Sequence, residues 1–280
     1  MSDNNIIWVT GAKGYLGSEL ARRFEAHGYT VAATDAELSV GEPERLEAFA
    51  QELHPLAVVN CAGIRRDATG LSNRIKAYEV NALGARNVAL AANSCGAIMV
   101  QISSDDVYSS KLEEPVNEFD NPHPDTPYGK SKRAGEAMVR DTMAEHVIVR
   151  SSWLYYAEGG RMKEILDAAK AGQKLPARMD QFAAPTSVAT YTEFLIRAIE
   201  KRAFGTFHIA TTGKASRYEF ASKVLEYAGY DAGSVLVPTT DPRTTENVVL
   251  ESLMLEMFGV ELPSWEEDLL AYMQSAGVAK

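Results

Sequence analysis

The stretch Ile6-Ile-Trp-Val-Thr-Gly-Ala-Lys-Gly-Tyr-Leu-Gly17 joins a short apolar run to three closely spaced glycines, Gly11, Gly14 and Gly17. The run predicts a buried strand, and helical periodicity from Tyr15 to His27 predicts a helix directly after the glycines. Glycines permit a tight turn and a close approach of the backbone to a pyrophosphate, while a helix N-terminus offers free N–H groups and a favourable dipole. The segment therefore predicts a dinucleotide-binding turn.

Two charged residues bear on which dinucleotide binds. Asp35 ends a second apolar run, Thr30 to Thr34, and could accept hydrogen bonds from the adenosine ribose. Its charge would repel a 2′-phosphate, which favours NAD(H), whereas Lys13 inside the glycine turn could attract that phosphate and favour NADP(H). Both cofactors stay open, and the balance favours NADH.

The rhythm of strand, turn and helix repeats through the first half of the chain. Helical stretches at about 42 to 53, 72 to 94 and 128 to 143 separate the predicted strands Thr30 to Thr34, Ala57 to Asn60, Ile98 to Ile102 and Val147 to Val149. Such alternation predicts an α/β fold, a Rossmann-like doubly wound parallel sheet with helices on both faces. We expect residues 1–150 to form the NAD(P)-binding domain.

The alternation fades after residue 150. Helical patterns near 160 to 171, 187 to 202, 216 to 228 and 264 to 275 surround one predicted strand, Thr206 to Ile209. We expect residues 151–280 to form mainly a smaller C-terminal substrate-binding lobe, with some later segments returning to the first domain.

Composition excludes several classes of function. The chain has 280 residues and a net charge of -10, so it offers no basic stripe for nucleic acid. No signal sequence or long apolar run indicates secretion or a membrane. The two cysteines, Cys61 and Cys95, lack metal-ligand spacing and suit a reducing compartment, so we expect a cytoplasmic protein without a metal site.

The segment Tyr128-Gly-Lys-Ser-Lys132 sets a tyrosine and a lysine about one helical turn apart, on a common face. A phenol, with an ordinary pKa of about 10, is a weak acid or base at neutral pH, but a nearby ammonium stabilises the phenolate and lowers that pKa. The pair therefore predicts a general acid.

The glycine turn together with Tyr-x-x-x-Lys resembles the extended short-chain dehydrogenases/reductases. A closer similarity, to the dTDP-4-dehydrorhamnose reductase family, spans nearly the whole chain. It lies in Val59-Asn-Cys-Ala-Gly63, Val80-Asn-Ala-Leu-Gly84, Val149-Arg-Ser-Ser-Trp153, Asp180-Gln-Phe-Ala-Ala-Pro-Thr-Ser187 and Phe258-Gly-Val-Glu-Leu-Pro263. The resemblance implies an NAD(P)H-dependent reductase of the 4-keto group of a nucleotide-linked 6-deoxy sugar.

The resemblance also implies roles for single residues. Ser104 would hydrogen-bond the substrate carbonyl, Tyr128 would protonate its oxygen as hydride arrives, and Lys132 would hold the ribose and lower the Tyr128 pKa. The positions implied at the dinucleotide, besides Tyr128 and Lys132, are Gly11, Lys13, Gly14, Tyr15, Leu16, Gly17, Asp35, Val40, Cys61, Ala62 and Gly63. Those expected at the sugar nucleotide are Ser104, Asp105, Asp106, Trp153 and Arg243.

The chain departs from the family at three places. Asp106 stands where the family usually has a tyrosine, and the pair Asp105-Asp106 is similar to the acid pair of sugar-nucleotide dehydratases. The loop Ile64 to Leu71 carries Arg65 and Arg66 in place of a more apolar segment. These two arginines could pair with a diphosphate, or they could be solvated loop charges. The third departure is Tyr155-Tyr156, where the family commonly has Tyr-Gly.

Two other functions stay open. One is epimerisation or dehydration of a sugar nucleotide on the same fold, and the other is a regulatory subunit that binds a dinucleotide without turnover. A homodimer is also open, although Thr190 and Arg197 stand in the stretch where some relatives hold an acidic, metal-bridged dimer contact.

Overall fold

The computed structural model describes residues 5–64 and 71–279, and these fall into two compact units. The first unit comprises Met1–Ser109, Asn121–Arg150 and Thr192–Phe207, and the second comprises Ser110–Asp120, Ser151–Tyr191 and His208–Lys280. Each unit is thus built from segments that lie far apart in the sequence. Arg65 and Arg66 lie outside the described residues.

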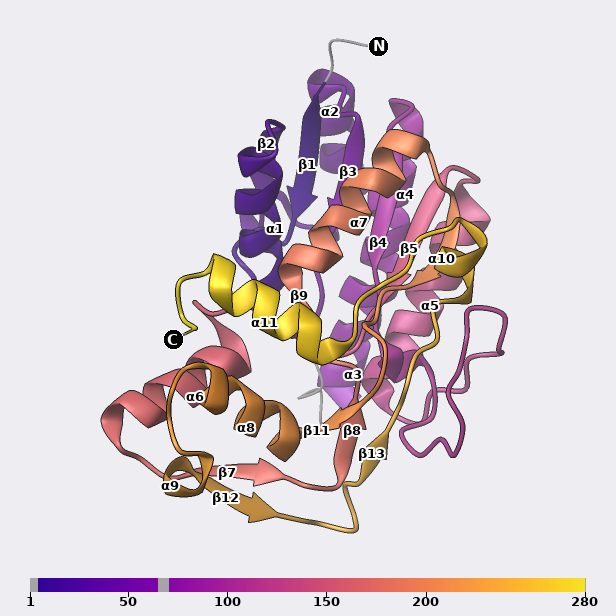
Figure 1. Cartoon of the computed structure of the whole chain (residues 1–280). Coiled ribbons are helices and arrows are strands. Elements are labelled where there is room, and N and C mark those ends of the chain that lie inside the picture. The colour runs from indigo at the N-terminus through magenta and orange to yellow at the C-terminus, as the bar shows by residue number, and fades with distance from the viewer. Residues whose placement is uncertain (1–4, 65–70, 280) are drawn as a thin grey trace. The chain divides into compact units, whose positions relative to one another are not determined.

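A six-stranded sheet forms the centre of the first unit, in the order β10-β5-β4-β3-β1-β2 (Figure 1). Its strands are β1 (Ile6–Thr10), β2 (Thr30–Thr34), β3 (Ala57–Asn60), β4 (Ile98–Ile102), β5 (His146–Arg150) and β10 (Gly205–His208). The strands from β1 to β5 pair in parallel, which confirms the predicted fold class. The order reverses between β1 and β3, and α/β sheets bind ligands beyond the carboxyl ends of the strands at such a point.

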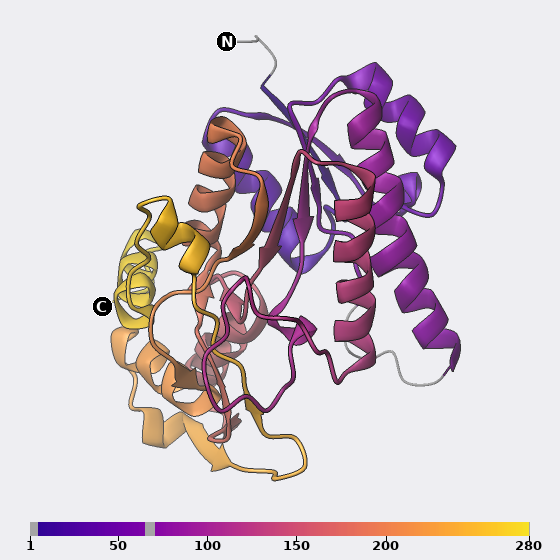
Figure 2. The ribbon, with the colours of Figure 1, turned by 90° about the vertical axis from the view of Figure 1, so that its right-hand side faces the viewer.

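Helices cover both faces of this sheet. They are α1 (Tyr15–Ala26), α2 (Pro43–Leu53), α3 (Leu71–Tyr78), α4 (Ala85–Ser94), α5 (Pro127–Thr142) and α7 (Val188–Lys201), which enters the unit at Thr192. Figure 2 shows α4 and α5 along one face and α7 on the other. Two short 3-10 turns, η1 (Ala36–Leu38) and η3 (Asp105–Val107), follow β2 and β4.

The helix predicted over 72 to 94 contains a π-helical segment, η2 (Glu79–Gly84), between α3 and α4. Gly135 of α5 packs on this segment so closely that a Cβ there would lie 2.1 Å from the Asn81 carbonyl oxygen. Single π turns inside α-helices often occur at functional sites. This one directs the buried Asn81 side chain toward α5, where it donates to Ser131.

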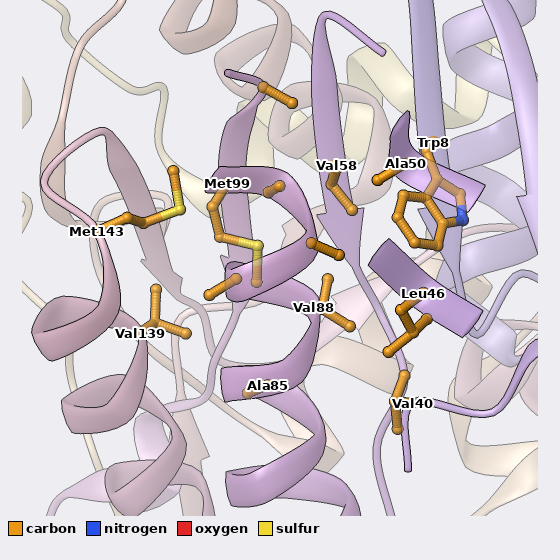
Figure 3. Packing of buried hydrophobic residues seen from close by; sticks show 14 of the residues in the cluster. Trp8, Val40, Leu46, Ala50, Val58, Ala85, Val88, Met99, Val139 and Met143 are labelled. Carbon is orange, nitrogen blue, oxygen red and sulfur yellow. The ribbon is translucent and has the colours of Figure 1, made fainter. Parts of the chain in front are cut away.

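One hydrophobic core of the first unit lies between the sheet and helices α2, α4 and α5 (Figure 3). Trp8, Leu46, Val88 and Met99 are fully buried there. The Trp8 indole also donates to Thr34 Oγ1 at 2.8 Å, so its polar N–H is satisfied. Burial of each such large apolar side chain stabilises the fold by roughly 1.5–3 kcal/mol.

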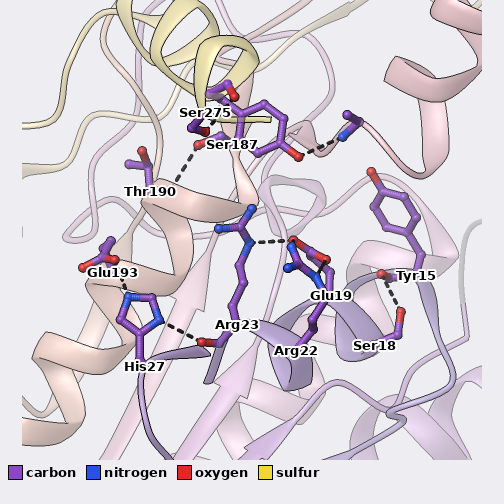
Figure 4. Close-up of polar contacts among 12 residues, drawn as sticks. Tyr15, Ser18, Glu19, Arg22, Arg23, His27, Ser187, Thr190, Glu193 and Ser275 are labelled. Atoms are coloured by element: carbon purple, nitrogen blue, oxygen red, sulfur yellow. Dashed lines mark hydrogen bonds and ion pairs between the residues drawn. The ribbon is translucent and has the colours of Figure 1, made fainter. Parts of the chain in front are cut away.

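Helix α1, which begins at the glycine turn, is fixed by charged contacts (Figure 4). The buried Glu19 carboxylate accepts from both Arg22 and Arg23, each at 2.6 Å. At the helix end, His27 lies 2.8 Å from the Arg23 carbonyl oxygen and 2.7 Å from the Glu193 carboxylate on α7. These contacts hold the helix whose N-terminus faces the predicted pyrophosphate site.

The second unit is built from small sheets and short helices. Its strand pairs are β6 (Leu154–Tyr155) with β9 (Thr186–Ser187), β7 (Leu175–Arg178) with β12 (Leu236–Thr239), and β8 (Gln181–Ala183) with both β11 (Ala215–Ser216) and β13 (Glu246–Asn247). Its helices are α6 (Gly160–Ala171), α8 (Arg217–Tyr227), α9 (Ala232–Val235), α10 (Leu253–Met257) and α11 (Trp265–Ser275).

A buried carboxylate joins three segments of the second unit. Asp268 of α11 accepts from the Tyr155 hydroxyl at 2.9 Å, from Ser187 N–H at 2.7 Å and from the Thr190 hydroxyl at 2.5 Å. Burial and the adjacent Asp268 charge raise the Tyr155 pKa well above its ordinary value, so this phenol stays protonated as a donor.

Across the described ranges, no helix is both long enough and apolar enough to cross a bilayer.

Candidate active site

The glycine turn after β1 forms a cradle that side chains would fill. Gly11 has a φ of +65°, and a Cβ at this position would lie 2.6 Å from Ala62 N. A Cβ at Gly17, the first buried residue of α1, would lie 2.3 Å from the Gly11 carbonyl oxygen. The backbone after β1 therefore passes directly against α1 and the segment after β3. Gly14 at the N-cap of α1 has no side chain to cap the helix, so the N–H groups of the first turn can contact an anion.

A pocket of about 500 Å³ lies at this edge of the sheet. Its lining residues are Gly11, Lys13, Gly14, Asp35, Ala36, Leu38, Ser39, Val40, Cys61, Ala62, Gly63, Ile64 and Val80. Eight of the thirteen positions expected at the dinucleotide therefore come together. The other five, which are Tyr15, Leu16 and Gly17 of α1 and Tyr128 and Lys132 of α5, are not among the lining residues. The cradle, the helix N-terminus and the pocket together fit a dinucleotide. Burial raises the pKa of the Cys61 thiol to about 12, which keeps the lining neutral at that point.

Three charged residues interlock at the rim of this pocket. Asp35 accepts from the backbone N–H of Lys13 at 3.0 Å and from that of Ala36 at 2.8 Å. The Lys13 ammonium pairs with the Glu37 carboxylate at 2.9 Å, and Glu37 in turn accepts from Asp35 N–H at 2.8 Å. Lys13 thus has a carboxylate partner of its own, which the sequence did not reveal.

Ser104 caps the short turn η3 just beyond β4. Its Oγ accepts from Asp106 N–H at 3.1 Å and lies 2.9 Å from Asp105 Oδ1 and 3.1 Å from Asp106 Oδ2. A serine hydroxyl has one proton, so it can donate to only one acceptor at a time. The Asp105-Asp106 pair therefore competes with any substrate oxygen for that proton.

Helix α5 carries both Tyr128 and Lys132. Thr126 caps its N-terminus by accepting from Gly129 N–H at 3.0 Å, and Pro127 occupies the first turn, where a missing N–H costs nothing. The buried Lys132 ammonium donates to the Ile102 carbonyl oxygen at the end of β4. Burial lowers the Lys132 pKa to about 8, although the Glu136 carboxylate opposes this shift.

The tyrosine end of α5 packs against the turn that carries Ser104. A Cβ on Gly129 would lie 1.8 Å from the Asp106 carbonyl oxygen, so only glycine permits this approach. Farther along, the Asn81 amide donates to Ser131 Oγ at 2.9 Å, and Ser131 donates to the Tyr128 carbonyl oxygen at 2.7 Å. Ser104, Tyr128 and Lys132 therefore sit on adjoining segments that close contacts hold in register.

One turn after Lys132 on α5 lies a buried network of charged side chains that the sequence analysis missed. Glu136, fully buried, accepts from Arg150 Nε at 2.9 Å and Nη2 at 2.8 Å, and from Ser103 Oγ at 2.6 Å. Arg150 also donates to the Tyr108 hydroxyl at 2.7 Å. Despite burial, the Arg150 and Ser103 contacts hold the Glu136 pKa below its ordinary value. The only signal in the sequence is an acid four residues after Lys132.

The other expected substrate residues belong to the second unit. Arg217 stacks over the Trp153 ring, with its guanidinium carbon 3.5 Å from the ring centre. Arg243 is 88% exposed in its side chain and pairs with Asp241 at 3.0 Å. Within this unit, therefore, the Trp153 indole already contacts one cation, and the Arg243 side chain is open to solvent.

The parallel sheet, the glycine cradle at its switch point and the Tyr128 and Lys132 helix define a dinucleotide-binding oxidoreductase of the extended short-chain dehydrogenase/reductase type. Residues 5–277 match the family model described as RmlD substrate binding domain, and the chain belongs to this family. The predicted family membership is thus confirmed.

Two curated relatives and one solved structure illustrate the family. The chain is 33% identical over 280 residues to the spore coat polysaccharide biosynthesis protein SpsK of Bacillus subtilis, with 98% of each chain covered. It is 30% identical over 282 residues to a dTDP-4-dehydrorhamnose reductase of Burkholderia thailandensis, covering 92% of this chain and 95% of that one. The crystal structure of dTDP-4-dehydrorhamnose reductase from Bacillus anthracis in complex with NADP matches with a TM-score of 0.88 and 31% identity, covering 97% and 99%.

Proposed function

We propose that the protein reduces the 4-keto group of a nucleotide-linked 6-deoxy sugar, as in the last step of dTDP-L-rhamnose synthesis. The observation that carries this proposal is the packing of the Tyr128 helix on the Ser104 turn. The same helix carries Lys132, whose charge interacts with Cys61 in the lining of a pocket that fits a dinucleotide. The names of the relatives from Burkholderia thailandensis and Bacillus anthracis support the same reaction.

The roles of the three central residues follow from their chemistry. A reduced nicotinamide, when bound, supplies the hydride. Ser104 orients the keto oxygen by donating its hydroxyl proton, and Tyr128 gives a proton to that oxygen as negative charge develops on it. The Lys132 ammonium stabilises the resulting phenolate. Asn81 acts indirectly, because it fixes Ser131 and through it the first turn of α5.

The pocket residues support a proposal for how each part of the cofactor would bind. Gly11 and Gly14, which line the pocket, and Gly17, which packs on the Gly11 turn, would hold the pyrophosphate, and Val40, with Cys61 to Gly63, would line the path of the dinucleotide. Asp35 would accept from the adenosine ribose hydroxyls and disfavour a 2′-phosphate, so we propose a preference for NADH. The second unit, mainly residues 151–280, would recognise the sugar nucleotide through Trp153 and Arg243.

A second candidate rests on the carboxylates beside Ser104. Asp105 and Asp106 both lie within hydrogen-bond distance of the Ser104 hydroxyl, and paired acids suit the elimination or proton abstraction of a dehydratase or epimerase. These enzymes return their cofactor to its starting state in each cycle. Net consumption of reduced cofactor therefore separates the two candidates.

A homodimer and a cytoplasmic location are also part of the proposal. The location is supported by the two cysteines, which are both free thiols.

The test uses purified protein, dTDP-4-keto-6-deoxy-L-mannose, and NADH or NADPH in separate reactions. The proposal predicts loss of reduced-cofactor absorbance in proportion to the sugar nucleotide added, faster with NADH at equal concentration. Cofactor binding without any consumption, seen by nicotinamide fluorescence, would contradict it and favour either the acid-pair chemistry or a regulatory role.

A further inference from the structure

Glu37 adds a second carboxylate beside the pocket at the glycine turn, in addition to Asp35 at the end of β2. Glu37 lies in the turn η1 and pairs with the Lys13 ammonium at 2.9 Å. Its other carboxylate oxygen accepts from Asp35 N–H at 2.8 Å, which fixes the side chain over the turn. The backbone carbonyl of Glu37 also accepts from Arg45 at 2.9 Å. Lys13 and the Asp35 N–H therefore hold the two carboxylate oxygens of Glu37, while Arg45 holds its backbone.

Among the described residues that line this pocket, Lys13 is the one with a basic side chain. A cofactor 2′-phosphate requires a cation near the ribose, whereas free ribose hydroxyls require an acceptor such as Asp35. Glu37 pairs with this ammonium, and the Asp35 carboxylate lies close by, where it accepts from the backbone N–H of Lys13. The local charge is therefore negative where a 2′-phosphate would add further negative charge.

We propose that Glu37 is a cofactor-selectivity residue, which withholds the Lys13 ammonium from a 2′-phosphate and so disfavours NADPH. This inference rests on the proposed function, because it takes the pocket at the glycine turn as the dinucleotide site. Glu37 acts through Lys13 and is a positioning residue. Asp35 selects for ribose hydroxyls directly, while Glu37 removes the cation that would otherwise offset that selection.

The experiment measures dissociation constants for NADH and NADPH by calorimetric titration, without sugar nucleotide. The variants are Glu37→Gln, Glu37→Gln combined with Lys13→Met, and the control Glu226→Gln, which removes the acid of another exposed lysine pair, in the second unit. Glutamine keeps an oxygen that can accept from Asp35 N–H, so the turn retains its contact. We expect Glu37→Gln to tighten NADPH binding by roughly two- to fivefold and to leave NADH binding nearly unchanged.

The gain should disappear in the double variant, because it depends on the released ammonium, and it should shrink with added salt, because exposed charges are screened. The control should not move either constant. Unchanged NADPH binding in Glu37→Gln, or a gain that survives Lys13→Met, would overturn the role of Glu37 alone. Failure of the wild-type protein to bind either dinucleotide would overturn the proposed function, and this inference with it.

Discussion

Gly129 and Asp106 are in contact, because the Cα of the helical glycine lies against the carbonyl oxygen of the turn residue, where a Cβ would approach to 1.8 Å. This contact joins the helix that carries Tyr128 to the turn that carries Ser104. The spacing between Tyr128, the proposed general acid, and the Ser104 hydroxyl therefore depends on the absence of one side chain.

Replacing Gly129 by Ala should push the helix and the turn apart. Overpacking of this kind costs about 1–3 kcal/mol of unfolding free energy, and a displacement of about 1 Å at a catalytic group can cost on the order of a hundredfold in rate. Urea unfolding and steady-state kinetics would measure both effects. The control is Gly233→Ala, where the added Cβ would meet the two Asp231 carboxylate oxygens at 3.5 and 3.8 Å, which is ordinary van der Waals contact. Equal behaviour of the two variants would contradict the importance of this contact.

Replacing Tyr128 by Phe removes the hydroxyl and keeps the ring. We expect kcat to fall by roughly 10²- to 10⁴-fold, because general acid catalysis is lost, with cofactor binding nearly unchanged. Steady-state turnover and cofactor titration check the two parts. Tyr227→Phe, on α8 in the second unit, is the matched control and should retain activity. A Tyr128→Phe variant with normal turnover would remove Tyr128 from the mechanism.

Much of this site could be predicted because its signals are local in sequence. The glycines of the turn, the acid at the end of β2 and the Tyr-x-x-x-Lys spacing each lie within a short segment, and the buried runs of β3 and β4 predict a parallel sheet. The predicted boundaries of β2, β3 and β4 agree with the structure residue for residue.

The missed features depend on partners that are distant in sequence or on small backbone details. Glu136 and Arg150 meet only because α5 returns to β5, and Lys13 reaches Glu37 only because β2 lies beside β1. The π turn at Asn81 leaves no mark in hydrophobic periodicity, since its residues still read as one helix. Strands of two residues, such as β6 and β9, are too short to alternate detectably.

The pH dependence should follow Lys132. Its folded pKa of about 8 lies below the ordinary value of 10.5 because of burial, so the ammonium is lost as pH rises through about 8. We expect kcat/KM to fall over that range. The unfolded state binds more protons than the folded state between these two pKa values, so the contribution of this group to unfolding free energy rises with pH.

Activity and stability therefore move in opposite directions for this one group. Kinetics and urea unfolding of the wild type and of Lys132→Met, each between about pH 7 and pH 10, isolate it by difference. If the pH profile of residual activity in Lys132→Met keeps the same alkaline fall, the titrating group is not Lys132.

Replacing Glu136 by Gln should destabilise the first unit strongly. The variant would leave the Arg150 guanidinium buried without its carboxylate, and breaking a buried ion pair in this way costs about 3–5 kcal/mol. Chemical denaturation followed by circular dichroism measures the loss. Asp167→Asn, in the exposed Lys163 pair of α6, is the control and should change stability little. Equal, small losses in the two variants would show that the network contributes no more than a surface pair.

Net hydride transfer to a keto sugar can be followed directly with a labelled cofactor. The protein is incubated with dTDP-4-keto-6-deoxy-L-mannose and NADH deuterated at both positions of the reactive nicotinamide carbon, and the sugar nucleotide is analysed by mass spectrometry. We predict a product heavier than the substrate by one deuterium and one proton, with one NAD⁺ formed for each product. A product of unchanged mass, or one that has lost water, with no net NAD⁺, would contradict the reductase and favour epimerisation or dehydration.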